Sequence, residues 1–228
     1  MGGIFHLPDH ERIRGALARG GFPASQADFD RAHYAAAIAF TSRDAEVPFR
    51  QFWRRYLDVY VNVCGVPVEL RPDVHRHLQS EFAVAALWSR IIPGSADGLR
   101  ALAATGVRLG VVSNADGTVQ ARLAEQGLLQ VGPGPGVAVE CVIDSGAVGV
   151  SKPDPRIFRI ALEVMQIAPD EAWYVGDTPA IDVAGARAAG LGPIVMDPFD
   201  LQDDADYVRV RSLDDVAALL RRSDVRAR

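Results

Sequence analysis

The feature that most constrains the fold is an alternation of short apolar runs and helical patterns that begins at Pro93. Each run has the length of a strand, and a stretch with helical periodicity follows most of them. The runs are VRLGVVSNA, VAVECVIDSG, AWYVGD, PIVMD and YVRVRS. Strands joined by helices run parallel, with helices on both faces of the sheet. The pattern predicts an α/β core built on a doubly wound parallel sheet. We expect the GPGPG segment at 132–136 to be a turn between a helix and a strand.

Residues 8–92 have a different pattern, which is nearly all helical. The helical segments are DHERIRGALARGG, SQADFDRAHYAAAIAF, PFRQFWRRYLDVYVNVCG and RPDVHRHLQSEFAVAALWSR. Ser25 and Asp28 have the spacing of a capping box with Asp in place of Glu, which predicts a helix start. In the third segment four aromatic residues share one stripe, namely Phe49, Phe52, Tyr56 and Tyr60. We interpret this stripe as the core of a helical bundle, with the lining of a substrate pocket as the alternative.

Composition narrows the classes of function. Of 228 residues, 49% are apolar and 23% are charged, which is typical of a soluble globular protein with a sizeable core. The net charge of −5 argues against nucleic acid or an anionic membrane as a partner. No signal peptide and no apolar run of about 18 residues is visible. Cys64 and Cys141 lie in separate apolar runs, so we expect buried free thiols and a cytoplasmic location.

Polar residues follow two of the apolar runs where strands are predicted to end. Ser113 and Asn114 close the run VRLGVV. A hydroxyl there, with backbone N–H groups of the next turn, can hold an anionic oxygen, although Ser113 could equally cap a turn. Lys152 in GVSKPDPRIF is followed by Pro153 and a predicted helix. It can act as a fixed positive charge that neutralises a phosphate, with a solvent-facing lysine as the alternative.

The stretch YVGDTPAIDVAGARAAG places two carboxylates at a third strand end. Asp177 follows the apolar run, and Asp182 lies just inside the next helix. The carboxyl ends of strands face the crevice where α/β sheets bind ligands. Magnesium prefers hard oxygen ligands and takes one or two carboxylates with water and substrate. The pair therefore predicts a magnesium site, and the alternative is a helix cap at Asp177 with a first-turn acid at Asp182.

Together these motifs resemble the haloacid dehalogenase-like hydrolase superfamily. The second, third and fourth motifs of that superfamily are matched by VVSN, SKPDPRIF and GDTPAID. The resemblance covers Pro93 to about Leu220 in sequence and the preceding region in architecture only. It implies a Rossmann-like core formed by residues 1–7 and 93–228, with a helical cap domain at residues 8–92.

The resemblance also implies roles for individual residues. Phosphate binding is expected from Ser113, Asn114 and Lys152. Catalytic roles are expected for Ser113, Lys152 and Asp177. Magnesium is expected at Asp177 and Asp182, with a contribution from the backbone carbonyl of Gly2.

The first motif of the superfamily, DxDx[TV], is matched only in part. Some members have DxGGxL there, and Met1-Gly2-Gly3-Ile4-Phe5 aligns with that form. Gly2 then stands where the acid/base Asp is expected, and the nucleophilic Asp would precede Met1. We expect the central first strand to be missing and the chain as given to be inactive. The proton for the leaving group would come from elsewhere, such as the cap, and we interpret His6 as a surface residue.

The resemblance favours magnesium-dependent hydrolysis of a small phosphorylated metabolite through an aspartyl-phosphate. The first alternative is a 2-haloacid dehalogenase, in which the same Asp attacks carbon without a metal, and GDTPAID argues against it. The alternative from another class is a non-catalytic binding or regulatory protein with the same fold.

Overall fold

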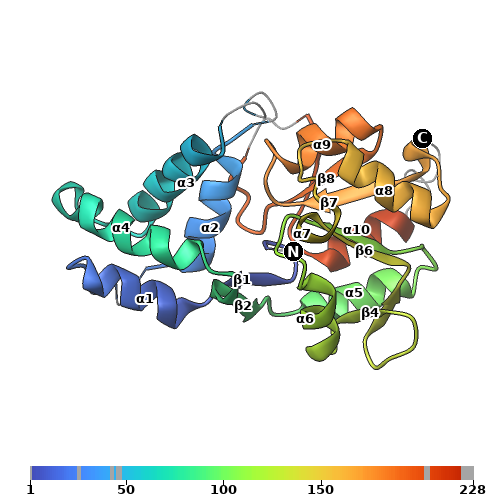
Figure 1. Cartoon of the computed structure of the whole chain (residues 1–228), viewed down its shortest axis with the longest axis horizontal. Helices are drawn as coiled ribbons and strands as arrows, with labels where there is room; N and C mark the ends of the chain where they lie inside the picture. Colours follow the sequence, from blue (N-terminus) through green and yellow to red (C-terminus); the bar gives the residue numbers. More distant parts are fainter. Residues whose placement is uncertain (1, 25–26, 42–43, 45–47, 203–205, 222–228) are drawn as a thin grey trace.

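The computed structural model describes residues 2–24, 27–41, 44, 48–202 and 206–221. A helical region and an α/β region lie side by side, with β1 (His6–Pro8) and β2 (Trp88–Ile91) between them (Figure 1). The two strands pair antiparallel. The chain therefore enters and leaves the helical region through one short ladder.

The helical region is built from helices whose apolar faces meet in one core. Its elements are α1 (His10–Arg19), α2 (Phe29–Ile38), α3 (Phe49–Val63), α4 (Arg71–Phe82) and the 3-10 turns η2 (Val68–Leu70) and η3 (Ala85–Leu87). The side chain of Asp28 accepts a hydrogen bond from the backbone N–H of Arg31, which makes Asp28 the N-cap of α2. Ser25, the other half of the predicted capping box, lies outside the described residues.

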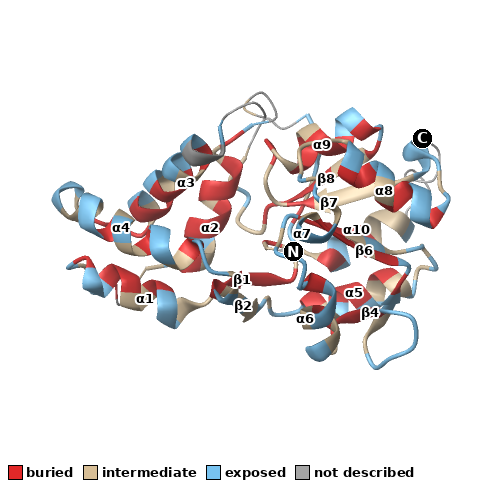
Figure 2. Ribbon diagram, in the orientation of Figure 1, coloured by how far each residue is buried: buried red, intermediate tan, exposed pale blue. Residues whose placement is uncertain are grey.

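The aromatic stripe of α3 packs into this core, as Figure 2 shows by burial. Phe52, Tyr56 and Tyr60 are buried. Tyr56 and Tyr60 lie against the ring of Phe82 on α4 together with Trp53 and Trp88, and Phe52 lies against Trp53 and Tyr56. All three residues belong to the bundle core, as predicted, and Phe52 and Tyr56 also line the cavity described below, so the pocket alternative applies to those two as well. The side chain of Phe49 lies outside the described part of the chain.

The α/β region alternates helices and parallel strands, as predicted. Its helices are α5 (Ser95–Ala103), α6 (Val119–Glu125), α7 (Ser145–Val148), α8 (Arg156–Met165), η4 (Pro169–Glu171), α9 (Asp182–Ala189) and α10 (Leu213–Arg221). Its strands are β3 (Gly110–Ser113), β4 (Leu129–Val131), β5 (Val137–Val139), β6 (Cys141–Asp144), β7 (Trp173–Gly176), β8 (Gly192–Met196) and β9 (Val208–Val210). Parallel pairs join β3 to β6, β4 to β5, β7 to β8 and β8 to β9.

Helices cover both faces of these strands because successive side chains of a strand point to opposite faces. Val112 and Ile143 pack with α8 and α9 in one hydrophobic cluster. Val111 and Val142 pack in another cluster with residues of α5, α6 and α10. This two-sided burial is typical of parallel sheets in α/β proteins and explains why the strands read as continuous apolar runs.

The ladders β3–β6 and β7–β8–β9 are separate within the described part of the chain. A side chain bridges them, because the hydroxyl of Tyr174 on β7 donates to the carbonyl oxygen of Val112 on β3 at 3.0 Å. In addition, Val111 of the first ladder and Val175 of the second pack in one hydrophobic cluster, the one that contains residues of α5, α6 and α10. Side-chain packing rather than backbone pairing therefore holds the two ladders together.

Two predicted segments differ from the structure. VAVECVIDSG forms two strands, β5 and β6, with a break at Glu140, whose N–H donates to the carbonyl of Leu109. The turn at 132–136 joins β4 to β5 rather than a helix to a strand, since α6 ends at Glu125. The side-chain amide of Gln130 holds this turn by donating to the carbonyl oxygen and accepting from the N–H of Gly136, at 3.0 and 2.8 Å.

The prediction of a surface His6 is wrong. His6 is fully buried, and its Nε2 lies 2.6 Å from Oε1 of Gln126. Burial lowers the pKa of this imidazole. Cys64 and Cys141 are buried free thiols, as predicted. Among the described residues, no helix is both long enough and apolar enough to span a membrane.

Tyr60 gives a stability prediction. Its fully buried hydroxyl has no hydrogen-bond partner within the described residues, which costs about 1–3 kcal/mol. We expect Tyr60→Phe to raise the free energy of unfolding by about 1 kcal/mol in urea denaturation. The matched control is Tyr56→Phe, which should lower it by about 1 kcal/mol because the Tyr56 hydroxyl bonds to His33. Effects of the same sign at both positions would contradict this account.

Candidate active site

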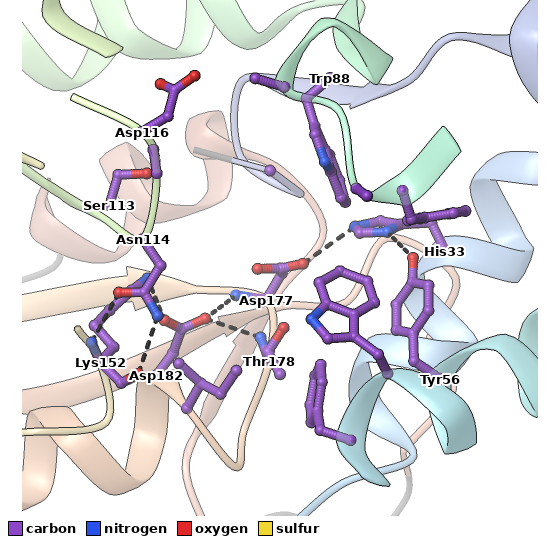
Figure 3. Close-up of a pocket in the computed structure, with 18 of the residues that line it drawn as sticks. His33, Tyr56, Trp88, Ser113, Asn114, Asp116, Lys152, Asp177, Thr178 and Asp182 are labelled. Carbon is purple, nitrogen blue, oxygen red and sulfur yellow. Dashed lines mark hydrogen bonds and ion pairs between the residues drawn. The ribbon is translucent and has the colours of Figure 1, made fainter. Parts of the chain in front are cut away.

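The residues that the sequence predicts for the site all line one cavity of about 290 Å³. Ser113 ends β3, and Asp177 directly follows β7. Because the carboxyl ends of parallel strands meet at one edge, these side chains converge there. The predicted residues in the lining are Gly2, Ser113, Asn114, Lys152, Asp177 and Asp182. Residues of the helical region form the opposite wall (Figure 3).

Lys152 and Asp182 form a buried ion pair at the base of the cavity. The Nζ–Oδ1 distance is 2.7 Å, and the two side chains are only 8% and 3% exposed. Nζ also donates to the hydroxyl of Tyr174 at 2.8 Å. Burial by itself would lower the pKa of Lys152, but Asp182 and Tyr174 outweigh it and raise that pKa. Burial would raise the pKa of Asp182, but Lys152 and the N–H of Thr178 lower it, so both groups stay charged.

Asp182 also organises the loop that carries Asp177. Its Oδ2 accepts hydrogen bonds from the backbone N–H groups of Asp177 and Thr178, at 3.0 and 2.9 Å. Gly176 is required beside it, because a Cβ there would overlap the Asp182 carboxylate. Both oxygens of Asp182 are thus bonded within the protein, and the residue positions Lys152 and Asp177 together.

Asn114 fixes the backbone of Lys152. Its Nδ2 donates to the carbonyl oxygen of Lys152 at 2.9 Å, and its Oδ1 accepts from the N–H of Lys152 at 2.7 Å. The next residue, Ala115, is held by Ser145, whose hydroxyl accepts from its N–H and donates to its carbonyl oxygen. Ser113, which precedes this loop, is 1% exposed. The loop after β3 and the loop before α8 therefore form one rigid unit.

His33, which no sequence motif indicates, reaches Asp177 from the helical region. Its Nε2 lies 3.1 Å from Oδ2 of Asp177, and its Nδ1 lies 2.6 Å from the hydroxyl of Tyr56 (Figure 3). An ionised carboxylate only accepts, so in the neutral imidazole Nε2 donates to Asp177 and Nδ1 accepts from Tyr56. A histidine on the buried face of a helix has no distinctive sequence signal, because core histidines share that position.

The Gly2-Gly3 segment packs against Asp177 from the other side. Gly3 has a φ of +69°, and a Cβ on it would overlap the Asp177 carboxylate. The hydroxyl of Tyr34 donates to the carbonyl oxygen of Gly3 at 2.8 Å, which ties the segment to α2. Glycine is therefore needed at this position for both the backbone conformation and the close approach.

The donors around Asp177 suit a hard cation. Oδ2 of Asp177 accepts from His33, which leaves Oδ1 for a cation. Oδ1 of Asp182 keeps a second lone pair beside its bond to Lys152. Gly2 lines the same cavity. Within the residues that the structure describes, no group of three His, Cys, Asp or Glu side chains forms a complete metal cage. Magnesium does not need such a cage, since it binds one or two protein carboxylates and keeps several waters or substrate oxygens. The residues present therefore fit magnesium.

The chain belongs to the haloacid dehalogenase-like hydrolase family, whose model matches residues 7–190. The chain is also similar in fold to solved structures, and the low sequence identity to them supports a shared fold and nothing further. A HAD phosphatase from Thermococcus onnurineus has a TM-score of 0.54 and 17% identity, with 96% of this chain and 94% of that chain covered. A HAD-superfamily hydrolase from Ehrlichia chaffeensis has a TM-score of 0.52 and 16% identity, with coverage of 93% and 86%.

Curated relatives match over part of their length. Haloacid dehalogenase-like hydrolase domain-containing protein 3 from Homo sapiens is 31% identical over 65% of this chain and 59% of its own length. A phosphoserine phosphatase from Thermus thermophilus is 49% identical over 29% of this chain and 27% of its own. A phosphoglycolate phosphatase from Rhodospirillum rubrum is 37% identical over 46% of this chain and 41% of its own.

The buried ion pair gives a second stability prediction. Removing one partner of a buried pair leaves the other charge uncompensated, which costs about 3–5 kcal/mol. We expect Asp182→Asn to lower the free energy of unfolding by about that amount in urea denaturation. The control is Asp97→Asn in the exposed pair with Arg100, which should change stability by less than about 1 kcal/mol. Equal effects of the two substitutions would contradict a central role for the pair.

Proposed function

We propose that this protein is a magnesium-dependent hydrolase of small phosphate monoesters. The observation that carries the proposal is Lys152, an ammonium kept charged by Asp182 in a cavity that Ser113 and Asp177 also line. Two of the relatives bear the names of phosphatases of small metabolites, which supports the same reaction class. In this proposal residues 8–92 act as a cap domain over a core formed by residues 1–7 and 93–228.

Ser113, Asn114 and Lys152 bind the phosphate group. Ser113 donates its hydroxyl and Asn114 its backbone N–H to phosphate oxygens, as at other anion sites that follow a strand. Lys152 has three N–H groups, and its bonds to Asp182 and Tyr174 use two of them. The third is available for the phosphate, where the fixed positive charge stabilises the charge of the transition state.

Asp177 and Asp182, with the backbone carbonyl of Gly2, are the proposed holders of magnesium. A bound magnesium ion supplies positive charge that polarises the phosphate oxygens. His33 holds one oxygen of Asp177, which orients the carboxylate and leaves the other oxygen for the cation.

The attacking group in this proposal is an aspartate on a strand between β3 and β7, encoded ahead of Met1. In the described structure β3 and β7 are not paired to each other. The hydroxyl of Tyr174 on β7 donates a hydrogen bond to the backbone carbonyl oxygen of Val112 on β3. The carboxylate attacks phosphorus, the ester oxygen leaves, and water hydrolyses the resulting acyl phosphate.

The decisive test compares this chain with one extended by its upstream codons in frame. We expect the extended chain to release phosphate from phosphate monoesters only with Mg²⁺, and the 228-residue chain to release negligible amounts, because covalent catalysis needs its nucleophile. A colorimetric phosphate assay measures both. Turnover by the shorter chain would contradict the proposed nucleophile.

The same pair of chains separates the alternatives. Release of halide from 2-haloacids without Mg²⁺ would favour a dehalogenase. Binding of phosphate esters by the extended chain without turnover would favour a non-catalytic binding protein.

His33 is the proposed proton donor to the leaving group, because Gly2 has no side chain and His33 reaches Asp177 from the helical region. It acts as the imidazolium, which gives its Nε2 proton to the ester oxygen and becomes the neutral imidazole that accepts from Tyr56 at Nδ1. In the extended chain we expect His33→Gln to lower kcat by about 10²–10⁴-fold for alkyl phosphates, which need a protonated leaving group. The loss should be only a few-fold for 4-nitrophenyl phosphate, whose leaving group is stable without a proton. Equal losses on both substrates would assign His33 a structural role.

A further inference from the structure

The two ends of the cavity differ in chemistry. The end at the strands carries Ser113, Lys152 and Asp177, which are polar or charged. The opposite wall is aromatic and comes from α3, α4 and β2, namely Phe52, Trp53, Tyr56, Phe82 and Trp88. A substrate whose phosphate lies at the strands therefore places the rest of its structure against aromatic rings (Figure 3).

The rings of this wall form one connected surface. Trp53 lies 5.7 Å from Phe52 and 5.8 Å from Phe82, and Phe82 lies 6.0 Å from Trp88, measured between ring centroids. Trp53 and Trp88 are only partly buried, so part of each ring is accessible at the cavity. Val84 and Ala85 continue the apolar surface toward the solvent.

Each basic side chain of the described lining already has a partner. Lys152 is paired with Asp182, and His33 bonds to Asp177. Arg122 donates to the carbonyl oxygen of Trp88 at 2.7 Å, and its charge interacts with that of Asp116, which also lines the cavity. A second anionic group on the substrate, such as a carboxylate, would meet aromatic rings and the pair of Arg122 and Asp116, whose charges offset each other, rather than a cation of its own. Burying an unpaired charge of this kind is costly.

We propose that the substrate is a monophosphate with an uncharged, aromatic or similarly apolar body, rather than a phosphorylated carboxylic acid. The proposal rests on the phosphatase function proposed above. Offset-stacked or edge-on aromatic contacts favour a flat body. The cavity of about 290 Å³ lies at the lower end of the volumes of small-molecule sites, which limits the body to a small group.

Isothermal titration calorimetry on the 228-residue chain with Mg²⁺ tests this without turnover. The probes are 1-naphthyl phosphate, phosphoglycolate and inorganic phosphate, with 1-naphthol as a control that lacks the phosphate. We expect the Kd of 1-naphthyl phosphate to be at least about tenfold below that of phosphoglycolate, because stacking and apolar burial add to the shared phosphate contacts.

A charge placed on the apolar wall should weaken this preference. Val84 is 42% exposed, so Val84→Arg can fold without disturbing the core. We expect it to strengthen phosphoglycolate binding and weaken 1-naphthyl phosphate binding, which reduces the ratio of the two affinities at least about fivefold. Val164→Arg is the matched control, since Val164 is 55% exposed on α8 and outside the cavity lining. It should leave the ratio unchanged.

The outcomes separate the two proposals. If inorganic phosphate binds but phosphoglycolate binds as tightly as 1-naphthyl phosphate, the substrate class is wrong and the phosphatase proposal stands. If neither inorganic phosphate nor any ester binds, the phosphate site itself is refuted, and the substrate class falls with it.

Discussion

The buried pair of Lys152 and Asp182 is the interaction on which the candidate site depends. Two charges in a nearly dry environment are costly unless their remaining hydrogen-bonding capacity is satisfied. Here the hydroxyl of Tyr174 accepts a hydrogen bond from a second N–H of Lys152. The second oxygen of Asp182 accepts hydrogen bonds from the backbone N–H groups of Asp177 and Thr178. The pair therefore fixes the loop after β7, and through that loop it fixes Asp177.

Asn114 extends this network to the loop after β3. Its side chain bonds both the N–H and the carbonyl oxygen of Lys152, so the motifs that follow β3, precede α8 and follow β7 form one hydrogen-bonded unit. Such a unit places a hydroxyl, an ammonium and a carboxylate around one point with little freedom to move. Preorganisation of this kind is the main electrostatic contribution of enzymes that stabilise charged transition states.

The helical region completes the site with a different chemistry. It contributes the aromatic wall of the cavity and the chain of hydrogen bonds from Tyr56 through His33 to Asp177. The chain passes between the two regions through β1 and β2, and the contact between His33 and Asp177 couples the position of one region to the geometry of the other. The α/β region supplies charge, and the helical region supplies apolar surface.

Much of the fold could be predicted from sequence because it follows from local patterns. Period and length of the apolar runs indicated parallel strands, and polar residues at the strand ends indicated where a site would form. Asp177 and Asp182 were found in this way, since residues at one edge of a parallel sheet meet whatever their separation in the chain. Lys152 was predicted at a strand end, but it lies between α7 and α8, where Asn114 fixes its backbone. Family membership, which the family model shows, agrees with the motif resemblance.

Other features depend on contacts between distant segments, which no local pattern reports. His6 looks like a turn residue in sequence, yet the packing of Gln126 beside it makes it part of the interior. In the sequence His33 looks like an ordinary core residue of a helix. Its contact with Asp177 exists only because α2 packs against the loop after β7. The sequence alone determined the α/β class and the residues at the strand ends, because periodicity and strand termini are local properties. Only the tertiary structure decided that both oxygens of Asp182 are bonded internally and that a helix supplies a histidine to Asp177. Those contacts arise from packing between elements far apart in the chain.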